Sequence, residues 1–151
     1  FLAEVKMEEL EIQAIESKKR SLKKYKKNLV KLSRLEEKLQ VLEERITSVR
    51  SPNMSGMPRG GTPVTLADLL ADKIELEERI ANQKEINREY KRAITKELDK
   101  LDNVKHIEVL ELFFIDCLTP EEIAKELSYD VRTVYRLYSE GVKALTELGA
   151  E

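Results

Sequence analysis

Residues 3–49 contain neither proline nor glycine, and this run constrains the fold more than any other feature. Apolar residues recur through its second part at steps that alternate mostly between three and four, which is typical of a coiled-coil helix. At about 1.5 Å per residue, such a helix would be about 70 Å long. We expect its inner face to consist of Leu22, Tyr25, Leu29, Leu32, Leu35, Leu39, Leu42, Ile46 and Val49.

A break follows at "SPNMSGMPRGGTP", where three prolines and three glycines end the helix. Thr65 then begins a second helix, and Asp68 three residues later completes a capping box. Two long helices joined in this way predict an antiparallel hairpin over residues 1–101, with a loop tip at 51–64. The expected inner face of the second helix is Leu66, Leu70, Ile74, Glu77, Ile80, Asn87, Tyr90, Ile94, Leu98 and Leu101.

Two features of the predicted hairpin depart from a regular coiled coil, namely polar residues on its inner face and a difference in length between its helices. Glu77 and Asn87 interrupt the inner face, so the pairing there is either loose or sets the register. The first helix is also longer than the second, so residues 1–15 extend beyond the hairpin. We expect the terminal helices or another subunit to cover the apolar residues of this overhang, which are Leu2, Val5, Leu10, Ile12 and Ile15.

The remaining chain predicts three shorter helices, at 104–116, 120–127 and 131–148. Thr119 and Glu122 are spaced as a capping box, with Pro120 at the first helical position. Only three residues are left for the turn between the last two helices, so these must cross steeply. The sequence therefore predicts an all-α protein, in which a coiled-coil hairpin precedes a three-helix helix-turn-helix domain at 104–151.

The outer face of the last helix carries polar side chains, as the recognition helix of a DNA-binding protein does. An alternative is a three-helix bundle used only for protein contacts. The tail's own charge favours that alternative, because residues 118–151 contain four basic and seven acidic residues. The residues expected on this face are Arg132, Thr133, Tyr135, Arg136, Ser139 and Lys143, and the candidate base readers among them are Arg132, Thr133, Tyr135 and Arg136.

The segment "LTPEEIAKELSYDVRTVYRLYSEGVKAL" resembles the region-four helix-turn-helix of bacterial sigma factors, and the likeness extends over residues 104–148. The shared pattern is Leu-Thr, then Glu-Ile-Ala, a Leu before the turn, and Val with an aliphatic residue on the second helix. More loosely, the whole chain resembles small Firmicute-phage proteins, including late transcription regulators of the ArpU and RinA type.

This resemblance implies roles for individual residues. Arg132, Thr133 and Arg136, with Tyr135 beside them, would approach base edges or phosphates. Thr119 and Glu121 would lie near the DNA backbone. The chain departs from the sigma pattern at Ser128, where many relatives have Gly, and at Val131, where sigma factors often have Arg. No promoter preference follows, and the upstream sigma regions are missing.

Residues 17–35 contain nine basic residues and no acidic one, although acidic clusters elsewhere bring the net charge to -2. A local basic field attracts a polyanion whatever the net charge. We therefore expect this stretch to contact phosphates while the tail selects sequence; a solvated helix face or a site for an acidic protein are the alternatives. The candidate phosphate contacts are Lys18, Lys19, Arg20, Lys23, Lys24, Lys26, Lys27, Lys31 and Arg34, with Thr119, Ser139 and Lys143 in the tail.

The loop at 51–64 is long enough to be functional. Arg59 lies between a proline and a glycine, where its guanidinium could bind a phosphate or a carboxylate. Met54 and Met57 could bury on a protein partner such as RNA polymerase. A loop without a partner is the alternative.

Catalytic and metal-binding signatures are scarce. Cys117 is the single cysteine, which excludes an intramolecular disulfide and a cysteine metal cage, and His106 is the single histidine. There is no phosphate-loop motif, metal-ligand spacing or nucleophile elbow. We expect neither an enzyme nor a bound metal or cofactor.

No run approaches the roughly 18 apolar residues that span a bilayer, and no charged-then-apolar leader is present. We therefore expect a cytoplasmic protein of a bacterial host cell, without membrane contact. The chain begins at Phe1 rather than Met, so we also expect its native start to be missing or processed.

The leading hypothesis is a phage or prophage regulator of transcription that binds double-stranded DNA sequence-specifically. A two-helix arm buries only one stripe per helix, so we expect a homodimer or higher oligomer. One alternative is a DNA-packaging adaptor like a small terminase subunit, which a ring of eight or more subunits would favour. The other is a coiled-coil scaffold that does not bind DNA.

Overall fold

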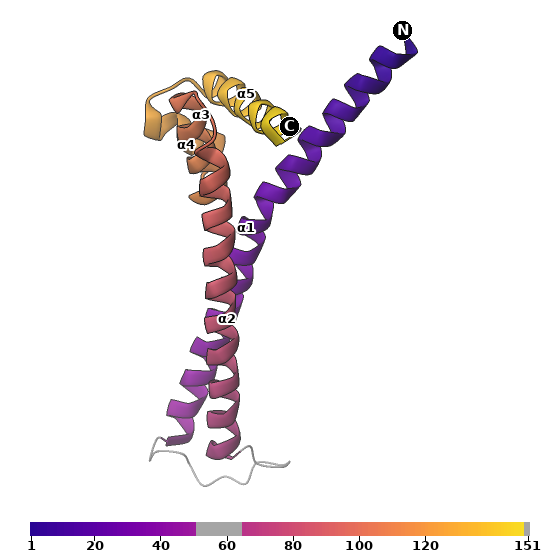
Figure 1. Ribbon diagram of the computed structural model, residues 1–151. Helices are drawn as coiled ribbons and strands as arrows, with labels where there is room; N and C mark the ends of the chain where they lie inside the picture. Colours follow the sequence, from indigo (N-terminus) through magenta and orange to yellow (C-terminus); the bar gives the residue numbers. More distant parts are fainter. Residues whose placement is uncertain (51–64, 150–151) are drawn as a thin grey trace. The chain divides into compact units, whose positions relative to one another are not determined.

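A computed structural model describes residues 1–50 and 65–149. Within these ranges the regular elements are all helices and there is no strand, so the predicted all-α class is confirmed for them. Five α-helices and one short π-helix follow one another along the chain (Figure 1). They are α1 (Leu2–Arg50), α2 (Leu66–Leu98), α3 (Val104–Leu110), η1 (Glu111–Ile115), α4 (Pro120–Leu127) and α5 (Val131–Gly149).

The chain divides into two compact units. One, which we call the helix-pair unit, comprises Asn28–Asn87. The other, the terminal unit, joins Phe1–Lys27 to Arg88–Glu151. The two long helices therefore contribute to both units. The sequence predicts that residues 1–27 and 88–101 belong to the hairpin, whereas they share a unit with the C-terminal helices.

In the helix-pair unit, segments of α1 and α2 pack through one apolar seam. Leu35, Leu76 and Ile80 form its buried core, and the half-buried Leu32, Leu39 and Leu42 pack against them. The chain directions are opposite, because Asn28 bonds to residues 83 and 87 while Glu43 lies 3.7 Å from Lys73. The inner residues expected for α1 are buried or half-buried, except Val49, which is 37% exposed.

A polar layer interrupts this seam. Asn87 is only 5% exposed, and its side-chain amide donates to the carbonyl of Asn28 at 3.3 Å. The Nε2 of Gln83 donates to the side-chain oxygens of Asn87 and Asn28, at 2.8 and 3.0 Å. A slip of the two helices would break these bonds inside a low-dielectric seam, so the layer sets the register rather than loosening the pairing.

The phase expected for the first half of α2 is wrong. Ile74 is 61% exposed and Glu77 is exposed, whereas Leu69 and Leu76 are buried. Successive steps of four drift around a helix, while steps averaging three and a half keep the seam on its partner. Ile74 and Leu76 are both apolar, so hydrophobicity alone could not choose between them.

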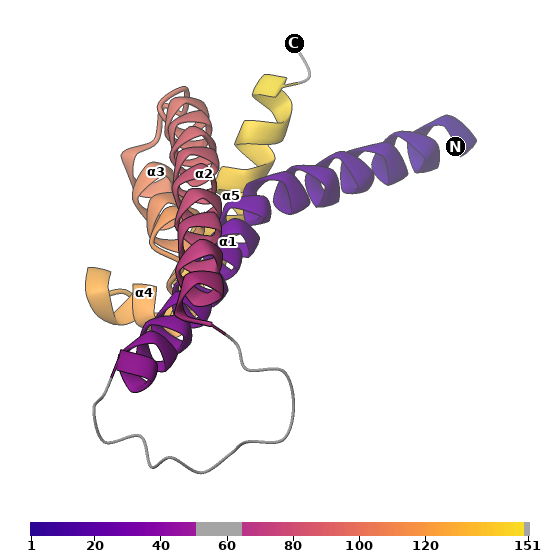
Figure 2. The same ribbon diagram turned by 90° about the horizontal axis from the view of Figure 1, so that it is seen from below.

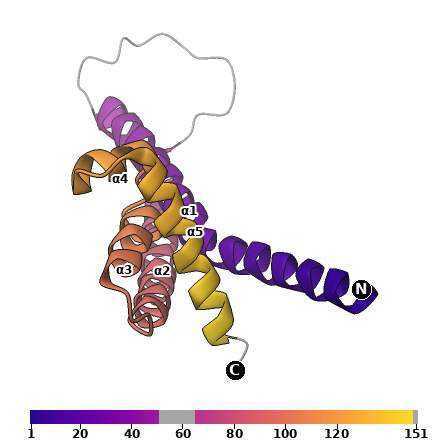
Figure 3. The same ribbon diagram turned by 90° about the horizontal axis from the view of Figure 1, so that it is seen from above.

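The core of the terminal unit gathers α3, α4 and α5 (Figures 2 and 3). Val109, Ile123, Ala124, Val134 and Leu137 are buried together in it. α4 has the predicted bounds and the predicted capping box, and α2 begins with the predicted box of Thr65 and Asp68. Both local start signals are therefore confirmed.

The prediction of a single α-helix at 104–116 is wrong. α3 ends at Leu110 and continues as the π-helix η1, after which Cys117 takes a left-handed conformation with φ 57. The wider turn lets Phe113 contact both Phe114 and Tyr138, with ring centroids 4.9 and 4.8 Å apart. A π-helical turn contains more residues than an α-helical turn, and here the wider turn occurs together with the packing of these aromatic rings.

Candidate nucleic-acid interface

The connection between α4 and α5 is short because one residue reverses the chain. Ser128 lies in the left-handed region, with φ 57 and ψ 41, and the amide of Tyr129 donates to the carbonyl of Ala124 at 2.9 Å. The carbonyl of Asp130 then accepts from the amides of Thr133 and Val134. α5 can therefore start immediately after the turn.

One face of α5 packs into the terminal unit, and the opposite face is polar. The buried residues are Val134, Leu137, Gly141, Val142 and Leu145. Steps of four, three and four place the other set on one stripe, which rises about 16 Å along the helix. This polar stripe consists of the exposed residues Arg132, Arg136, Ser139 and Lys143.

The four candidate base readers are not equivalent. Arg132 and Arg136 lie on the polar stripe, and their side chains form no hydrogen bond or ion pair with another described residue. Tyr135 is 49% exposed on the flank of the stripe, and Thr133 is half-buried. The two arginines are therefore the members of the set best placed to reach a ligand.

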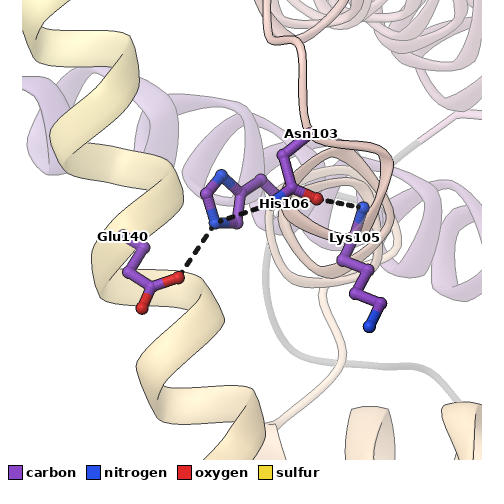
Figure 4. Close-up of polar contacts among 4 residues, drawn as sticks. All are labelled: Asn103, Lys105, His106 and Glu140. Carbon is purple, nitrogen blue, oxygen red and sulfur yellow. Dashed lines mark hydrogen bonds and ion pairs between the residues drawn. The ribbon is translucent and has the colours of Figure 1, made fainter.

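A hydrogen-bonded contact beside the polar stripe was missed from the sequence. Glu140 of α5 lies 3.1 Å from Nε2 of His106 in α3, and Asn103 is 3.5 Å from the same nitrogen (Figure 4). Asn103 also caps α3, because its side-chain oxygen accepts from the amide of Lys105 at 3.0 Å. The Asn at the helix start was the available signal for the cap, but residues 106 and 140 are too far apart in sequence to pair by pattern.

Thr119 already has a structural task. Its hydroxyl accepts from the amide of Glu122 at 3.2 Å and lies 3.1 Å from the carboxylate of the same residue. A phosphate would have to compete with this cap for the hydroxyl group. The phosphate contact expected for Thr119 therefore stays a prediction.

The basic side chains of the α1 stretch differ in exposure, because Lys18 and Lys19 are half-buried and the other seven are exposed. Lys18 forms an ion pair of 2.7 Å with Glu97, and Lys19 lies 3.6 Å from Glu16 and 5.6 Å from the ring centroid of Tyr138. These two lysines therefore contact groups of the terminal unit itself. The exposed members of the stretch are Arg20, Lys23, Lys24, Lys26, Lys27, Lys31 and Arg34.

Burial raises the pKa of Tyr25 within this stretch and perturbs two acidic groups near it. It raises the pKa of the Cys117 thiol, with Asp116 adding to the effect and Lys26 opposing it. Burial also raises the pKa of Tyr138, and the charge of Glu16 adds to it. Both groups therefore stay protonated, and hence uncharged, to higher pH than usual.

An open groove of about 660 Å³ lies between α1 and the end of α5 in the terminal unit. Met7, Leu10, Lys143 and Thr146 are among its lining residues. The overhang expected at residues 1–15 is largely uncovered by the terminal helices: Leu2, Val5, Leu10 and Ile12 are exposed, and Ile15 is half-buried.

The loop residues Met54, Met57 and Arg59 lie outside the described residues. Within the described ranges, no group of three or more His, Cys, Asp or Glu side chains could hold a metal ion. No helix in these ranges has the length and apolarity to cross a membrane.

A family model described as "Protein of unknown function (DUF1492)" matches residues 48–146. The matched span includes α2, α3, η1, α4 and most of α5, but not the basic stretch of α1. Comparisons with curated proteins and with solved structures gave no match.

Proposed function

We propose that this protein, which belongs to the family described as DUF1492, is a phage or prophage transcription regulator that binds double-stranded DNA. In this proposal α4 and α5 form a helix-turn-helix, and α5 is the recognition helix. The observation that carries the proposal is the polar stripe, with Arg132, Arg136 and Lys143 exposed on the face opposite the buried Val134 and Leu137.

The dimensions of α5 support this role. A major groove about 12 Å wide admits one helix, and its base edges are read by side chains from the exposed face. Arg132 and Arg136 are one helical turn apart, so both can point into the same groove. An arginine can bind the O6 and N7 atoms of guanine through two hydrogen bonds, which would give sequence preference.

The basic stretch of α1 would supply affinity without sequence choice. Seven of its basic side chains are exposed, whereas the tail carries more acidic than basic residues. Each phosphate that a cation neutralises adds about 0.9 to the slope of log affinity against log salt. We expect α5 to contribute the preference and α1 to contribute most of the salt dependence.

The test measures DNA binding by fluorescence anisotropy, with a random duplex and with fragments selected from a genomic library. Arg132→Ala with Arg136→Ala should abolish the preference between the two and leave weak general binding. Arg45→Ala with Arg79→Ala is the matched control, because it removes two exposed guanidinium groups from the helix-pair unit. An unchanged preference in the first variant would remove α5 from the reader role.

A second variant tests the basic stretch. Lys23→Gln, Lys26→Gln and Lys27→Gln should weaken binding to both duplexes equally and lower the salt slope, by about 0.9 per lost phosphate contact. A slope equal to that of the wild type would mean that these lysines do not contact DNA. No binding of any duplex at low salt would favour the scaffold alternative.

A further inference from the structure

We propose that two copies of this protein associate through α1, with the acidic beginning of one helix lying antiparallel along the basic stretch of the other. Residues 1–16, the acidic segment, contain five glutamates and one lysine. Residues 17–35, the basic segment, contain nine basic residues and no acidic one. The two segments follow one another in a single continuous helix, so only another molecule can bring them side by side.

The acidic segment has an apolar face that no described part of the chain covers. Leu2, Val5 and Ile12 are 76%, 42% and 60% exposed. Their spacing places them on one side of α1, together with Glu9 and Glu16. This side is opposite to that of Met7 and Leu10, which line the groove beside α5. The terminal unit therefore leaves the face of Val5 and Ile12 open to a second copy.

The order of charges matches a two-fold axis between Ser17 and Lys18. An antiparallel pair centred there places Glu8 and Glu9 of one copy beside Lys26 and Lys27 of the other. All four side chains are exposed. The symmetry repeats every pair on the other half of the interface, as it does in any isologous dimer.

The same axis places Glu16 opposite Lys19 of the second copy and one residue away from Arg20; Glu16 and Arg20 are exposed. Ile12 then lies opposite Lys23, whose aliphatic stem can cover it while the ammonium remains in water. A parallel pair would set glutamates against glutamates and lysines against lysines. Charge therefore selects the antiparallel arrangement and its register.

The arrangement has a consequence for the proposed function. Lys26, Lys27 and Arg20 are also candidate phosphate contacts, so the acidic segment of a second copy and a DNA duplex would compete for them. This consequence rests on the DNA-binding proposal, whereas the self-association does not. The acidic segment of one copy would then cover these basic residues of the other copy whenever DNA is not bound to them.

The test is a charge exchange between two full-length variants. The first variant carries Glu8→Lys, Glu9→Lys and Glu16→Lys, and the second carries Arg20→Glu, Lys26→Glu and Lys27→Glu. All six positions are exposed, so the fold should tolerate them; circular dichroism and thermal unfolding check this. Sedimentation velocity then measures the mass of each variant alone and of the equimolar mixture.

The wild type should dimerise at low salt and dissociate as salt shortens the Debye length from about 10 Å at 0.1 M to about 3 Å at 1 M. Each variant alone should bind itself more than about tenfold more weakly than the wild type, because like charges then face each other. The equimolar mixture should recover the dimer. A monomeric wild type, or a mixture that stays monomeric, would overturn the proposal.

Adding a random duplex to the wild type separates the two proposals. A falling dimer fraction supports the competition for the lysines. A dimer that persists while DNA binds elsewhere, or that forms in a protein which binds no DNA, counts against phosphate contact by α1 and leaves the self-association standing.

Discussion

Gly141 occupies the position where α5 passes closest to α3. A Cβ built at this residue would lie 2.9 Å from Cδ1 of Leu110, 3.2 Å from its Cγ and 3.4 Å from Cβ of His106. Leu110 is fully buried, with an exposure of 0%. We predict that Gly141→Ala destabilises the protein even though alanine is the better helix former.

The size of the effect follows from two opposing contributions. In an open helix position the change would stabilise by about 1 kcal/mol, because glycine loses more backbone entropy than alanine. Here the new methyl group must displace Leu110 within a packed core, and overpacking of this kind costs about 1–3 kcal/mol. The net loss should be up to about 2 kcal/mol.

A double-mutant cycle with Leu110→Ala isolates the contact. Leu110→Ala alone should cost about 2–5 kcal/mol, because it leaves a cavity. That cavity is where the methyl group introduced by Gly141→Ala would go, so in this background the same change should stabilise by about 1 kcal/mol. Urea unfolding followed by circular dichroism measures all four proteins, and the sign of the effect should reverse between the two backgrounds.

Two results would refute this reasoning. If Gly141→Ala destabilises equally in both backgrounds, then Leu110 is not the obstacle. If it stabilises the otherwise wild-type protein, then the core yields to the methyl group at no cost, and the close approach of α5 to α3 does not depend on a glycine.

Four other changes test individual features of the structure. Ser128→Gly should raise the free energy of unfolding by about 0.5–1 kcal/mol, measured by urea unfolding. A left-handed conformation costs a residue with a Cβ about 1–2 kcal/mol, and the extra chain entropy of glycine offsets part of this gain. Asn87→Ala should cost about 1–3 kcal/mol in thermal unfolding, because it removes one of the two acceptors of the half-buried Gln83 amide and the donor to the Asn28 carbonyl. Thr119→Ala should cost about 1 kcal/mol through the lost cap, measured in the same way. The raised pKa of Cys117 means that the fold favours the protonated thiol, so its contribution to the free energy of unfolding should be fully present below about pH 8.5, the usual pKa of a thiol. This contribution should fall as the pH rises through the raised pKa. Cys117→Ser should flatten that decline when the free energy of unfolding is measured against pH.

Local chemistry was sufficient to predict where most helices begin. The boxes at Thr65 and Thr119 each involve groups three residues apart, so the sequence contains both partners. The stripe of Arg132 and Arg136 was equally readable, because helical spacing and the buried Val134 determine it together. These features depend on a few neighbouring residues and not on the rest of the fold.

The features that the sequence missed depend on distant partners. The π-helix η1 accompanies the packing of Phe113 and Phe114 around Tyr138, which lies on another helix. The phase of α2 depends on which of its apolar residues faces α1. Lys18 is expected from the sequence to be a phosphate contact, but its ammonium pairs with Glu97, 79 residues away. Periodicity along one segment does not contain this information.

The acidity of the tail is a weaker objection to DNA binding than its residue count suggests. Glu122 belongs to the cap of α4, and Glu140 lies against His106. Both carboxylates therefore have partners within the terminal unit. The polar stripe of α5 itself contains Arg132, Arg136 and Lys143 and no acidic residue. A duplex approaching this stripe would meet the positive side chains on it, whereas carboxylates more than about 8 Å away would be largely screened at physiological salt. The position of each carboxylate, and not the sum, thus decides whether this helix can approach phosphate.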